Sequence, residues 1–242
     1  MTLRPLTRAE SRSIDASAAA LGLPTTLLME NAGRGAADWL RTRLESLRLE
    51  LARAPRVLVA CGPGNNGGDG AVVARHLDGQ GVQVEVAWSA SPAQLRGDAA
   101  FQQAVLHASG ITQSFYSTTP WSRFEESLAR ADWVVDALLG TGLARPVEGL
   151  FADAIQAVEE ARKPVLALDI PSGLDADTGL PLGRALHATA TATFAAPKIG
   201  FENPAAAAYL GEVFVVDLGL PLCILWPFLG PADVLPTAFN VP

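Results

Sequence analysis

Cysteine, histidine and basic residues are scarce in this sequence, and each shortage excludes a class of protein. Two cysteines, Cys61 and Cys223, cannot build a disulfide framework, and with three scattered histidines they form no metal-ligand spacing. Lys and Arg number 18 against 25 Asp and Glu, which gives a formal net charge of −7 at pH 7. Because nucleic-acid backbones attract a basic face, we expect no nucleic-acid partner.

Segments for export or membrane insertion are also missing from the sequence. The opening residues, MTLRPLTRAE, lack the apolar centre of a signal peptide. The apolar segment Leu218–Gly230 is interrupted by Pro221 and Pro227 and is too short to cross a bilayer. We therefore expect a cytoplasmic protein that has no membrane contact and whose cysteines stay reduced.

Hydrophobic residues, in contrast, are plentiful. They make up 49% of the 242 residues, with a mean hydropathy of +0.23, which is enough for the core of one large domain. Thr7 and Glu10 form a capping-box pattern that predicts a first helix over Arg8–Leu21. A second helix is expected from Thr25 to about Ala52, where apolar residues recur near helical spacing.

From Arg56 onward, short apolar runs alternate with amphipathic segments, as strands alternate with helices in an α/β fold. This alternation predicts a mostly parallel sheet with helices on both faces. Two later strands lack amphipathic helices between them and are expected to extend one edge, where an antiparallel orientation is open. The expected strands are Arg56–Cys61, Val82–Trp88, Thr112–Tyr116, Trp133–Leu138, Val165–Ile170, Ala190–Ala196 and Val213–Val216, and the later helices are Gly97–Ser109, Trp121–Ala131 and Val147–Ala161.

The segment Arg56–Leu77 reads as a strand, a glycine-rich turn and a helix. Its glycines, which include Gly62, Gly64 and Gly67, would permit positive φ angles and close approach of a ligand, and the following helix N-terminus favours a phosphate. The G-x-G-x-x-G spacing matches the dinucleotide fingerprint. However, the fingerprint expects an acidic residue roughly 20 positions further on, at the end of the second strand, and there Glu85 lies mid-strand instead. A hydride-transfer dehydrogenase is therefore disfavoured.

Polar residues follow several of the expected strands at their carboxyl ends, where ligands collect in parallel sheets. The first strand is followed by Asn65, Asn66 and Asp69. Later strand ends carry Asp136, Asp169 and Lys198. Ordinary turns also use aspartate and glycine, so one such strand end would mean little. Several at one edge of a sheet predict a polar pocket.

The motifs at these strand ends together resemble one family, the NAD(P)H-hydrate epimerases, also called the YjeF N-terminal domain family. The resemblance extends from Arg8 to about Pro221. It implies a Rossmann-like α/β/α sandwich and the interconversion of the R and S forms of NADHX and NADPHX, hydrated nicotinamide nucleotides whose S form a separate dehydratase repairs. The motifs are MENAG (Met29–Gly33), GPGNNGGDG (Gly62–Gly70), DALLGTGL (Asp136–Leu143), DIPSGLDADTG (Asp169–Gly179) and TFAAPKIG (Thr193–Gly200).

The resemblance also implies which residues form the site. It assigns a potassium ion to Asn66, Asp136 and Ser172, whose oxygen atoms suit a hard cation. On sequence alone, the alternative for Asp136 is a turn or cap residue, and Ser172 reads as a turn hydroxyl between Pro171 and Gly173. The implied substrate-binding residues are Asn65, Asn66, Gly67, Gly68, Asp69, Gly140, Thr141, Gly142, Leu143, Ala144, Arg145, Pro146 and Asp169.

Epimerisation of a carbon that bears a hydroxyl group beside a ring nitrogen can proceed by loss and re-addition of water. That route needs a group that protonates the departing oxygen and later deprotonates water. We expect Asp169 to do this, because a carboxyl group at the end of a buried strand is desolvated, which favours its protonated form. Lys198 would add charge near the phosphates or near Asp169, unless it is a surface lysine.

The domain organisation predicted from the sequence is a single epimerase domain over residues 1–221, followed by an apolar tail over residues 222–242 and no dehydratase domain. The tail would pack on an edge of the domain or serve self-association. Members of the family are often dimeric, so a homodimer is one possible assembly. The alternative function is a non-catalytic nucleotide-binding sensor or scaffold on the same fold. A kinase-like enzyme is a weaker alternative, since the sequence has no P-loop lysine motif.

Overall fold

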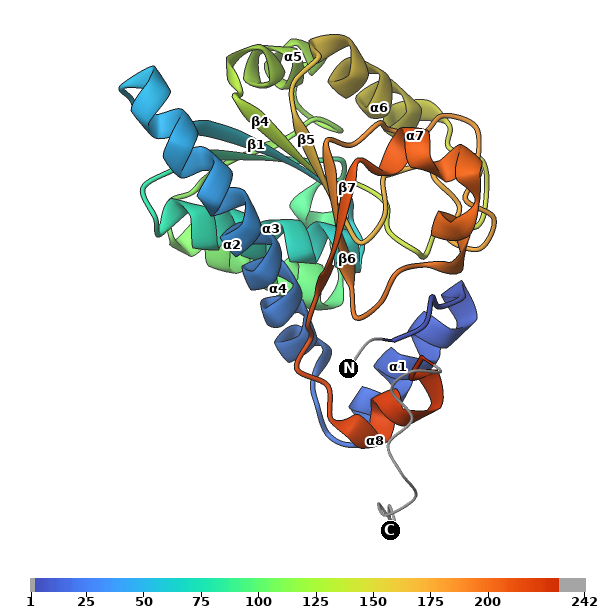
Figure 1. Cartoon of the computed structure of the whole chain (residues 1–242). Helices are drawn as coiled ribbons and strands as arrows, with labels where there is room; N and C mark the ends of the chain where they lie inside the picture. The colour runs from blue at the N-terminus through green and yellow to red at the C-terminus, as the bar shows by residue number, and fades with distance from the viewer. Residues whose placement is uncertain (1–2, 231–242) are drawn as a thin grey trace.

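A computed structural model describes residues 3–230 of the chain. Its centre is a single seven-stranded sheet in the order β3-β2-β1-β4-β5-β6-β7, and every pair of neighbouring strands is parallel (Figure 1). The strands are β1 (Arg56–Cys61), β2 (Gln83–Trp88), β3 (Thr112–Phe115), β4 (Trp133–Ala137), β5 (Val165–Leu168), β6 (Ala190–Phe194) and β7 (Glu212–Val216). The predicted α/β fold with a parallel sheet is confirmed.

The late strands correct one part of that prediction. β6 pairs with β5 and β7 in parallel, so it lies inside the sheet. Of the two late strands, β7 alone is an edge strand, and β3 forms the opposite edge. An antiparallel orientation for these strands is wrong. Parallel pairing needs a connection that returns the chain to the starting edge of the sheet. Here the short helices η2 (Ile199–Glu202), η3 (Pro204–Ala206) and α7 (Ala207–Leu210) make that return between β6 and β7.

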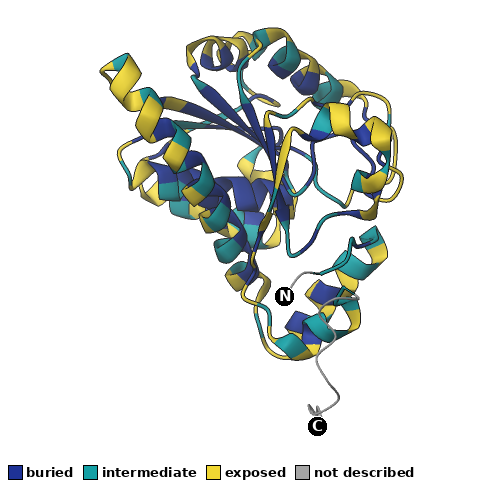
Figure 2. Cartoon of the chain, viewed as in Figure 1, coloured by how far each residue is buried: buried dark blue, intermediate teal, exposed yellow. Residues whose placement is uncertain are grey.

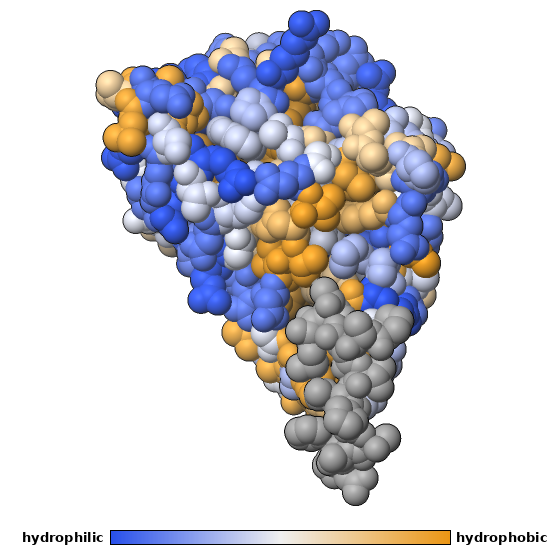
Figure 3. Space-filling view, viewed as in Figure 1, coloured by the Kyte–Doolittle hydropathy of each residue, from blue (hydrophilic) through white to orange (hydrophobic). Residues whose placement is uncertain are grey.

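Helices cover both faces of the sheet (Figure 1). On one face α2 (Thr25–Leu51), α3 (Asn65–Asp78) and α4 (Gly97–Ala108) share a hydrophobic core with the strands, and on the other α5 (Trp121–Arg130) and α6 (Gly149–Ala161) do the same. The central strands are buried, as expected for strands covered on both sides (Figure 2). The edge strand β7 is more open, since Val213 and Val215 are exposed, and an apolar strip lies over it (Figure 3).

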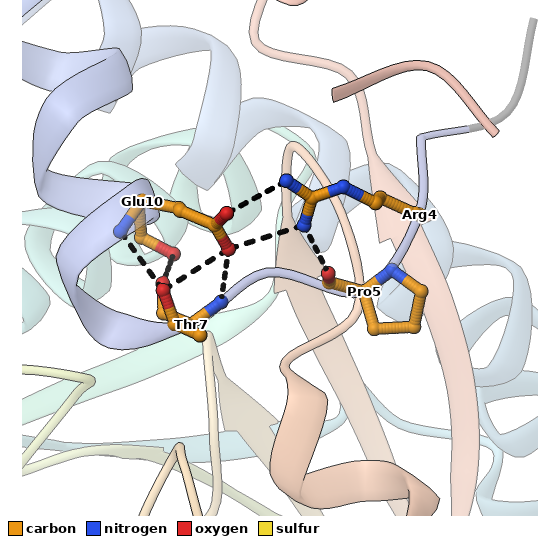
Figure 4. Close-up of polar contacts among 5 residues, drawn as sticks. Arg4, Pro5, Thr7 and Glu10 are labelled. Carbon is orange, nitrogen blue, oxygen red and sulfur yellow. Dashed lines mark hydrogen bonds and ion pairs between the residues drawn. The ribbon is translucent and has the colours of Figure 1, made fainter. Parts of the chain in front are cut away.

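The N-terminal helix α1 (Arg8–Ala20) begins at the predicted capping box, which is confirmed. Thr7 Oγ1 accepts a hydrogen bond from the backbone N–H of Glu10 at 3.2 Å, and the Glu10 carboxylate accepts one from the N–H of Thr7 at 2.9 Å. Arg4 donates to the same carboxylate at 2.6 Å (Figure 4). These contacts fix the point where the chain turns from the N-terminal segment into α1.

The first part of the apolar tail packs against the N-terminal segment and α1. Residues 222–230 form α8 (Leu222–Leu225) and the turn η4 (Trp226–Phe228), and Ile224 is buried in a cluster with Leu6 and Ile14. Residues 231–242 lie outside the described residues. Among residues 3–230, no helix is both long enough and apolar enough to cross a membrane.

The strand order also fixes where a ligand can enter. The chain runs outward from β1 to β2 and β3, and then returns to place β4 on the other side of β1. The connections that leave β1 and β4 therefore diverge at their carboxyl ends. In open parallel sheets this point of divergence is where ligands bind.

Candidate functional site

A cleft of about 570 Å³ opens at that point, at the carboxyl ends of the central strands. Its floor and walls come from the start of α3, from the connection after β4, and from Asp169 and Lys198 further along the chain. Helix α1 and the first turns of α2 add a further wall. Its polar lining residues are Ser11, Arg12, Asp15, Thr25, Asn65, Asn66, Asp69, Thr141, Arg145, Asp169 and Lys198.

The glycine-rich segment forms the first wall, with a geometry that differs from the expected turn. Helix α3 already begins at Asn65, so Asn65–Asp69 belong to its first turns rather than to a loop. Within Gly62–Gly70 no glycine has a positive φ angle. Instead, these glycines permit close packing: a Cβ on Gly62 would lie 1.9 Å from the carbonyl oxygen of Leu138, and one on Gly67 would lie 1.9 Å from that of Gly62. The helix start is thus held tightly against the end of β4.

Asp169 and Lys198 form an ion pair on the floor of the cleft. Lys198 Nζ lies 2.7 Å from Asp169 Oδ1. The other carboxylate oxygen of Asp169 accepts a hydrogen bond from the backbone N–H of Thr141 at 3.2 Å. Asp169 follows β5 directly and has φ of +65°, a conformation that is uncommon for residues other than glycine. This backbone conformation and the two donors hold the carboxylate in one orientation.

Lys198 is one of the most deeply buried side chains in the molecule, so the surface-lysine alternative is wrong. It is 1% exposed, and its ammonium group also donates to the carbonyl oxygens of Phe194 at 3.0 Å and Ala196 at 3.2 Å. Beside it, the N-terminal segment pairs with the chain through hydrogen bonds from Leu6 N–H to Pro197 and from Ile199 N–H to Leu6. A lysine this deeply buried is expected only with an anionic partner.

A second polar cluster lies just behind the cleft and contains two of the three residues expected to bind potassium, Asp136 and Ser172. The buried Asp136 carboxylate accepts hydrogen bonds from Ser172 Oγ at 2.6 Å and from the Ser172 N–H at 2.8 Å. Burial raises the pKa of Asp136 to about 6, although these hydrogen bonds favour its ionised form. Ser172 Oγ also accepts from the N–H of Leu139 at 2.9 Å.

Asn66 lies next to this cluster, across the same connection. A Cβ on Gly140 would lie 3.3 Å from Asn66 Cγ and 3.3 Å from Asp169 Oδ2. Because glycine has no side chain, Asn66 and Asp169 can both approach Gly140 closely. Both the amide oxygen and the amide nitrogen of Asn66 are buried without a hydrogen-bond partner among the described residues. Leu139 and Gly140 therefore link the Asp136 cluster to the cleft.

Asp69 points into the cleft from the second turn of α3. The residue is 8% exposed, and within residues 3–230 no group donates a hydrogen bond to its carboxyl group. Burial, followed by the negative charges of Asp169, Asp15 and Asp98, raises the pKa of Asp69 well above its usual range. Asp69 and Asp169 thus face one cleft in different electrostatic surroundings.

The structure separates the predicted site residues into two groups. Most of them line the cleft or the cluster behind it, but Gly67, Gly68 and Pro146 do not line it. Gly67 packs on Gly62, and Gly68 packs on Met29. The sequence did not predict that α1 contributes Arg12 and Asp15 to the cleft. The amphipathic pattern of a helix does not show which distant part of the chain the helix covers.

Other reactive residue types play no part in this cleft. Cys61 is fully buried beneath the start of α3, as expected for a small apolar residue, and burial raises the pKa of its thiol. Across residues 3–230, no three His, Cys, Asp or Glu side chains are grouped so that they could hold a metal ion. Any cation held here would need amide, hydroxyl or carbonyl oxygens in addition to carboxylates.

Comparison with known proteins gives a consistent result. The family described as "YjeF-related protein N-terminus" matches residues 25–200. The chain is 41% identical over 230 residues to a NAD(P)H-hydrate epimerase from Rhodopirellula baltica, covering 94% of this chain and 89% of that protein. It is also 41% identical over 222 residues to one from Pirellula staleyi, covering 90% and 93%.

Longer relatives and a solved structure extend the comparison. A protein from Moorella thermoacetica named bifunctional NAD(P)H-hydrate repair enzyme is 38% identical over 200 residues, and the match covers 82% of this chain but 37% of that protein. The crystal structure of the yeast protein YNL200c superposes with a TM-score of 0.77 at 22% identity, covering 93% of both chains. This likeness supports the fold described above.

Proposed function

The chain belongs to the family of YjeF-related protein N-termini, and from this premise we propose that it interconverts the R and S forms of NAD(P)H-hydrate. Relatives named as NAD(P)H-hydrate epimerases match it along nearly its whole length. The observation that carries the proposal is the Asp169–Lys198 pair, a half-buried carboxylate held by a buried lysine in a cleft that begins at a helix N-terminus. A non-catalytic binding module would have no need of such a pair.

Several features of the cleft suit a nicotinamide nucleotide as substrate. The first backbone N–H groups of α3 have no partner within the helix, and such a terminus favours phosphate. Arg12 and Arg145 add positive charge at the exposed part of the lining. Leu139, Leu143 and Phe151 provide apolar surface for a ring. The reacting carbon would then lie near Asp169.

The reaction is acid–base chemistry at the carbon that bears the hydroxyl group. The hydroxyl oxygen is protonated and leaves as water, while the lone pair of the ring nitrogen stabilises the resulting cation. Water then adds to the other face and loses a proton to a carboxylate. Asp169 suits the second task, because Lys198 and the N–H of Thr141 both donate to its carboxylate and hold it in one orientation as an acceptor.

We further propose that Asn66, Asp136 and Ser172 hold a potassium ion, and their surroundings support this. The buried Asp136 carboxylate has only neutral donors as partners, and the Asn66 amide is buried without one. A carboxylate, an amide and a hydroxyl oxygen form the kind of donor set that a hard cation prefers. When bound, the ion would supply positive charge behind the cleft and fix the Leu139–Gly140 connection.

The potassium proposal is tested by stability rather than by activity. A bound ion stabilises the folded state, so the Tm should rise with potassium chloride and not with tetramethylammonium chloride at equal ionic strength. Asp136→Asn should remove the difference between the two salts. Equal melting temperatures of the wild type in both salts would exclude the site.

The function itself is tested with R-NADHX and purified protein, by resolving the two epimers chromatographically over time. We expect faster approach to equilibrium than in the spontaneous reaction. Asp169→Asn should lose most of this rate while melting as a folded protein, since asparagine tolerates the same positive φ angle. No acceleration by the wild type would refute the enzyme assignment.

The cellular location and the partner enzyme stay predictions. The expected setting is the cytoplasm, together with a separate NAD(P)H-hydrate dehydratase that consumes the S form. A homodimer also stays a prediction, and the apolar strip over β7 is one surface that it could use (Figure 3). The preference between NADHX and NADPHX would be measured in the same epimer assay.

A further inference from the structure

The acid that begins the reaction is a separate question from the base that ends it. Asp169 is held as an ion pair with Lys198 at 2.7 Å and accepts a hydrogen bond from the Thr141 N–H. Both partners are donors, so each oxygen atom of Asp169 is already engaged as an acceptor. A hydroxyl group cannot leave from a carbon in this cleft unless another side chain protonates it first.

Two carboxyl groups that line the cleft accept no hydrogen bond within residues 3–230, the exposed Asp15 and the buried Asp69, and burial makes Asp69 the one suited to hold a proton. It lines the same cleft, it is 8% exposed, and no group among residues 3–230 donates a hydrogen bond to it. A buried carboxylate without donors is costly, whereas a protonated carboxyl group in the same place carries no charge and offers one O–H donor. The position therefore suits the neutral acid.

The charges that surround Asp69 act in the same direction. Asp169 follows β5, Asp15 projects from α1 and Asp98 from α4, and all three disfavour a further negative charge at Asp69, in addition to its burial. The cation of the cleft floor, Lys198, is engaged by Asp169. The N-terminus of α3 favours an anion, but Asp69 is beyond the first turn, where that effect is concentrated.

Resting on the proposed epimerase function, we propose that Asp69 is the general acid that protonates the departing hydroxyl group, and that Asp169 is the base that receives a proton from the incoming water. In the first step the Asp69 proton moves to the hydroxyl oxygen, the C–O bond breaks with both electrons on oxygen, and the ring nitrogen lone pair forms a C=N bond. In the second, water attacks that carbon and its proton goes to Asp169. No electron is gained or lost overall, and solvent exchange returns both carboxyl groups to their starting states.

The fold supports this division because the two groups reach the cleft from different sides. Asp69 comes from α3, which follows β1, and Asp169 from the end of β5, with β4 between these strands. Neighbouring strands lie about 4.8 Å apart, so the ends of β1 and β5 are separated by roughly 10 Å of sheet. Inversion of one carbon requires departure from one face and addition at the other. An acid and a base on separate walls perform this without moving the substrate.

The test compares Asp69→Asn with wild type in the R-to-S assay. Asparagine keeps the shape of the side chain but cannot donate the acidic proton, so kcat should fall by about 10²–10⁴-fold with KM little changed. The kcat of the wild type should fall as pH rises through the pKa of Asp69, and this limb should be absent from the variant. Asp78→Asn is the matched control: it makes the same substitution at an exposed position in the last turn of α3, outside the cleft lining, and should keep kcat close to wild type.

The outcomes separate this assignment from the function on which it rests. An inactive wild type would overturn the epimerase function and the assignment with it. An active wild type beside an equally active Asp69→Asn variant, or a variant that changes KM alone, would overturn the assignment only. Should the variant not fold, the wild type decides: a kcat that does not fall at any alkaline pH where the protein stays folded contradicts an acid at Asp69. An S product that keeps the original hydroxyl oxygen after reaction in ¹⁸O-water would also contradict the assignment.

Discussion

Lys198→Met should destabilise the protein strongly, because the lysine is buried where water cannot replace its contacts. Its side chain is 1% exposed, and its ammonium group meets Asp169 Oδ1 at 2.7 Å and the carbonyl oxygens of Phe194 and Ala196 at 3.0 and 3.2 Å. Methionine fills much of the same volume. The substitution therefore removes the charge and the donors while it leaves little cavity.

The size of the effect follows from what the substitution leaves behind. The Asp169 carboxylate would keep one hydrogen-bond donor, the Thr141 N–H. The carbonyl oxygens of Phe194 and Ala196 would each lose the hydrogen bond that Lys198 donates. Removing one partner of a buried ion pair costs about 3–5 kcal/mol. For a domain of this size, about 2–4 °C of Tm corresponds to each kcal/mol, so Tm should fall by roughly 6–20 °C. Because the Asp169 side chain is 13% exposed to the cleft, we expect the lower half of that range.

Thermal unfolding followed by circular dichroism measures the change, with a double variant as the decisive comparison. Lys198→Met combined with Asp169→Asn leaves no unpaired charge and should recover part of the lost Tm. Lys163→Met is the control and should melt close to wild type, since Lys163 donates to the Ala129 carbonyl oxygen at the surface and forms no salt bridge within residues 3–230. A Lys198→Met variant as stable as wild type, or a double variant that recovers nothing, would refute the reasoning about the buried pair.

Two further predictions concern the elements around the site. Gly62→Ala should cost about 1–3 kcal/mol or more, because its Cβ would meet the Leu138 carbonyl oxygen at 1.9 Å, whereas Gly64→Ala, with nothing within 4 Å, should unfold like wild type. Equal denaturant midpoints for the two variants would contradict this. Glu10→Gln should lower the unfolding free energy by about 1 kcal/mol at neutral pH. Contacts with Arg4 and Thr7 lower the pKa of Glu10 to about 2, so its contribution is full above the unfolded pKa near 4.3 and disappears as pH falls to about 2. The difference between wild type and Glu10→Gln should shrink over that window, and a constant difference would argue against the charge.

The parts of the fold that follow from local patterns could be predicted from the sequence. The capping box at Thr7 and Glu10 and the alternation from Arg56 to Leu168 depend on neighbours in the chain, and both were found as expected. The orientation of β6 and β7 could not be read in this way. It depends on a connection of short helical turns whose direction no period of hydrophobic residues records.

The glycines of Gly62–Gly70 show a second limit. Glycine was expected to permit positive φ angles there, but the structure uses it for backbone contact with Leu138 and within the turn itself. Both uses require the absence of a side chain, so the residue type alone cannot distinguish them. The position of a distant strand end, here that of β4, decides whether a glycine is needed for a positive φ angle or for close backbone contact.

The charge states of the candidate site are the property that is hardest to predict from the sequence. Asp69 and Asp169 each come after a buried strand, and the chain offers no local sign that they differ. What separates them is one ammonium group and one backbone N–H, which Lys198 and Thr141 bring to Asp169 and not to Asp69. Both donors come from other strand connections, so the difference exists only once the sheet has formed. If one carboxyl group is the acid and the other the base, as we infer, the division of labour is set by tertiary structure rather than by either motif.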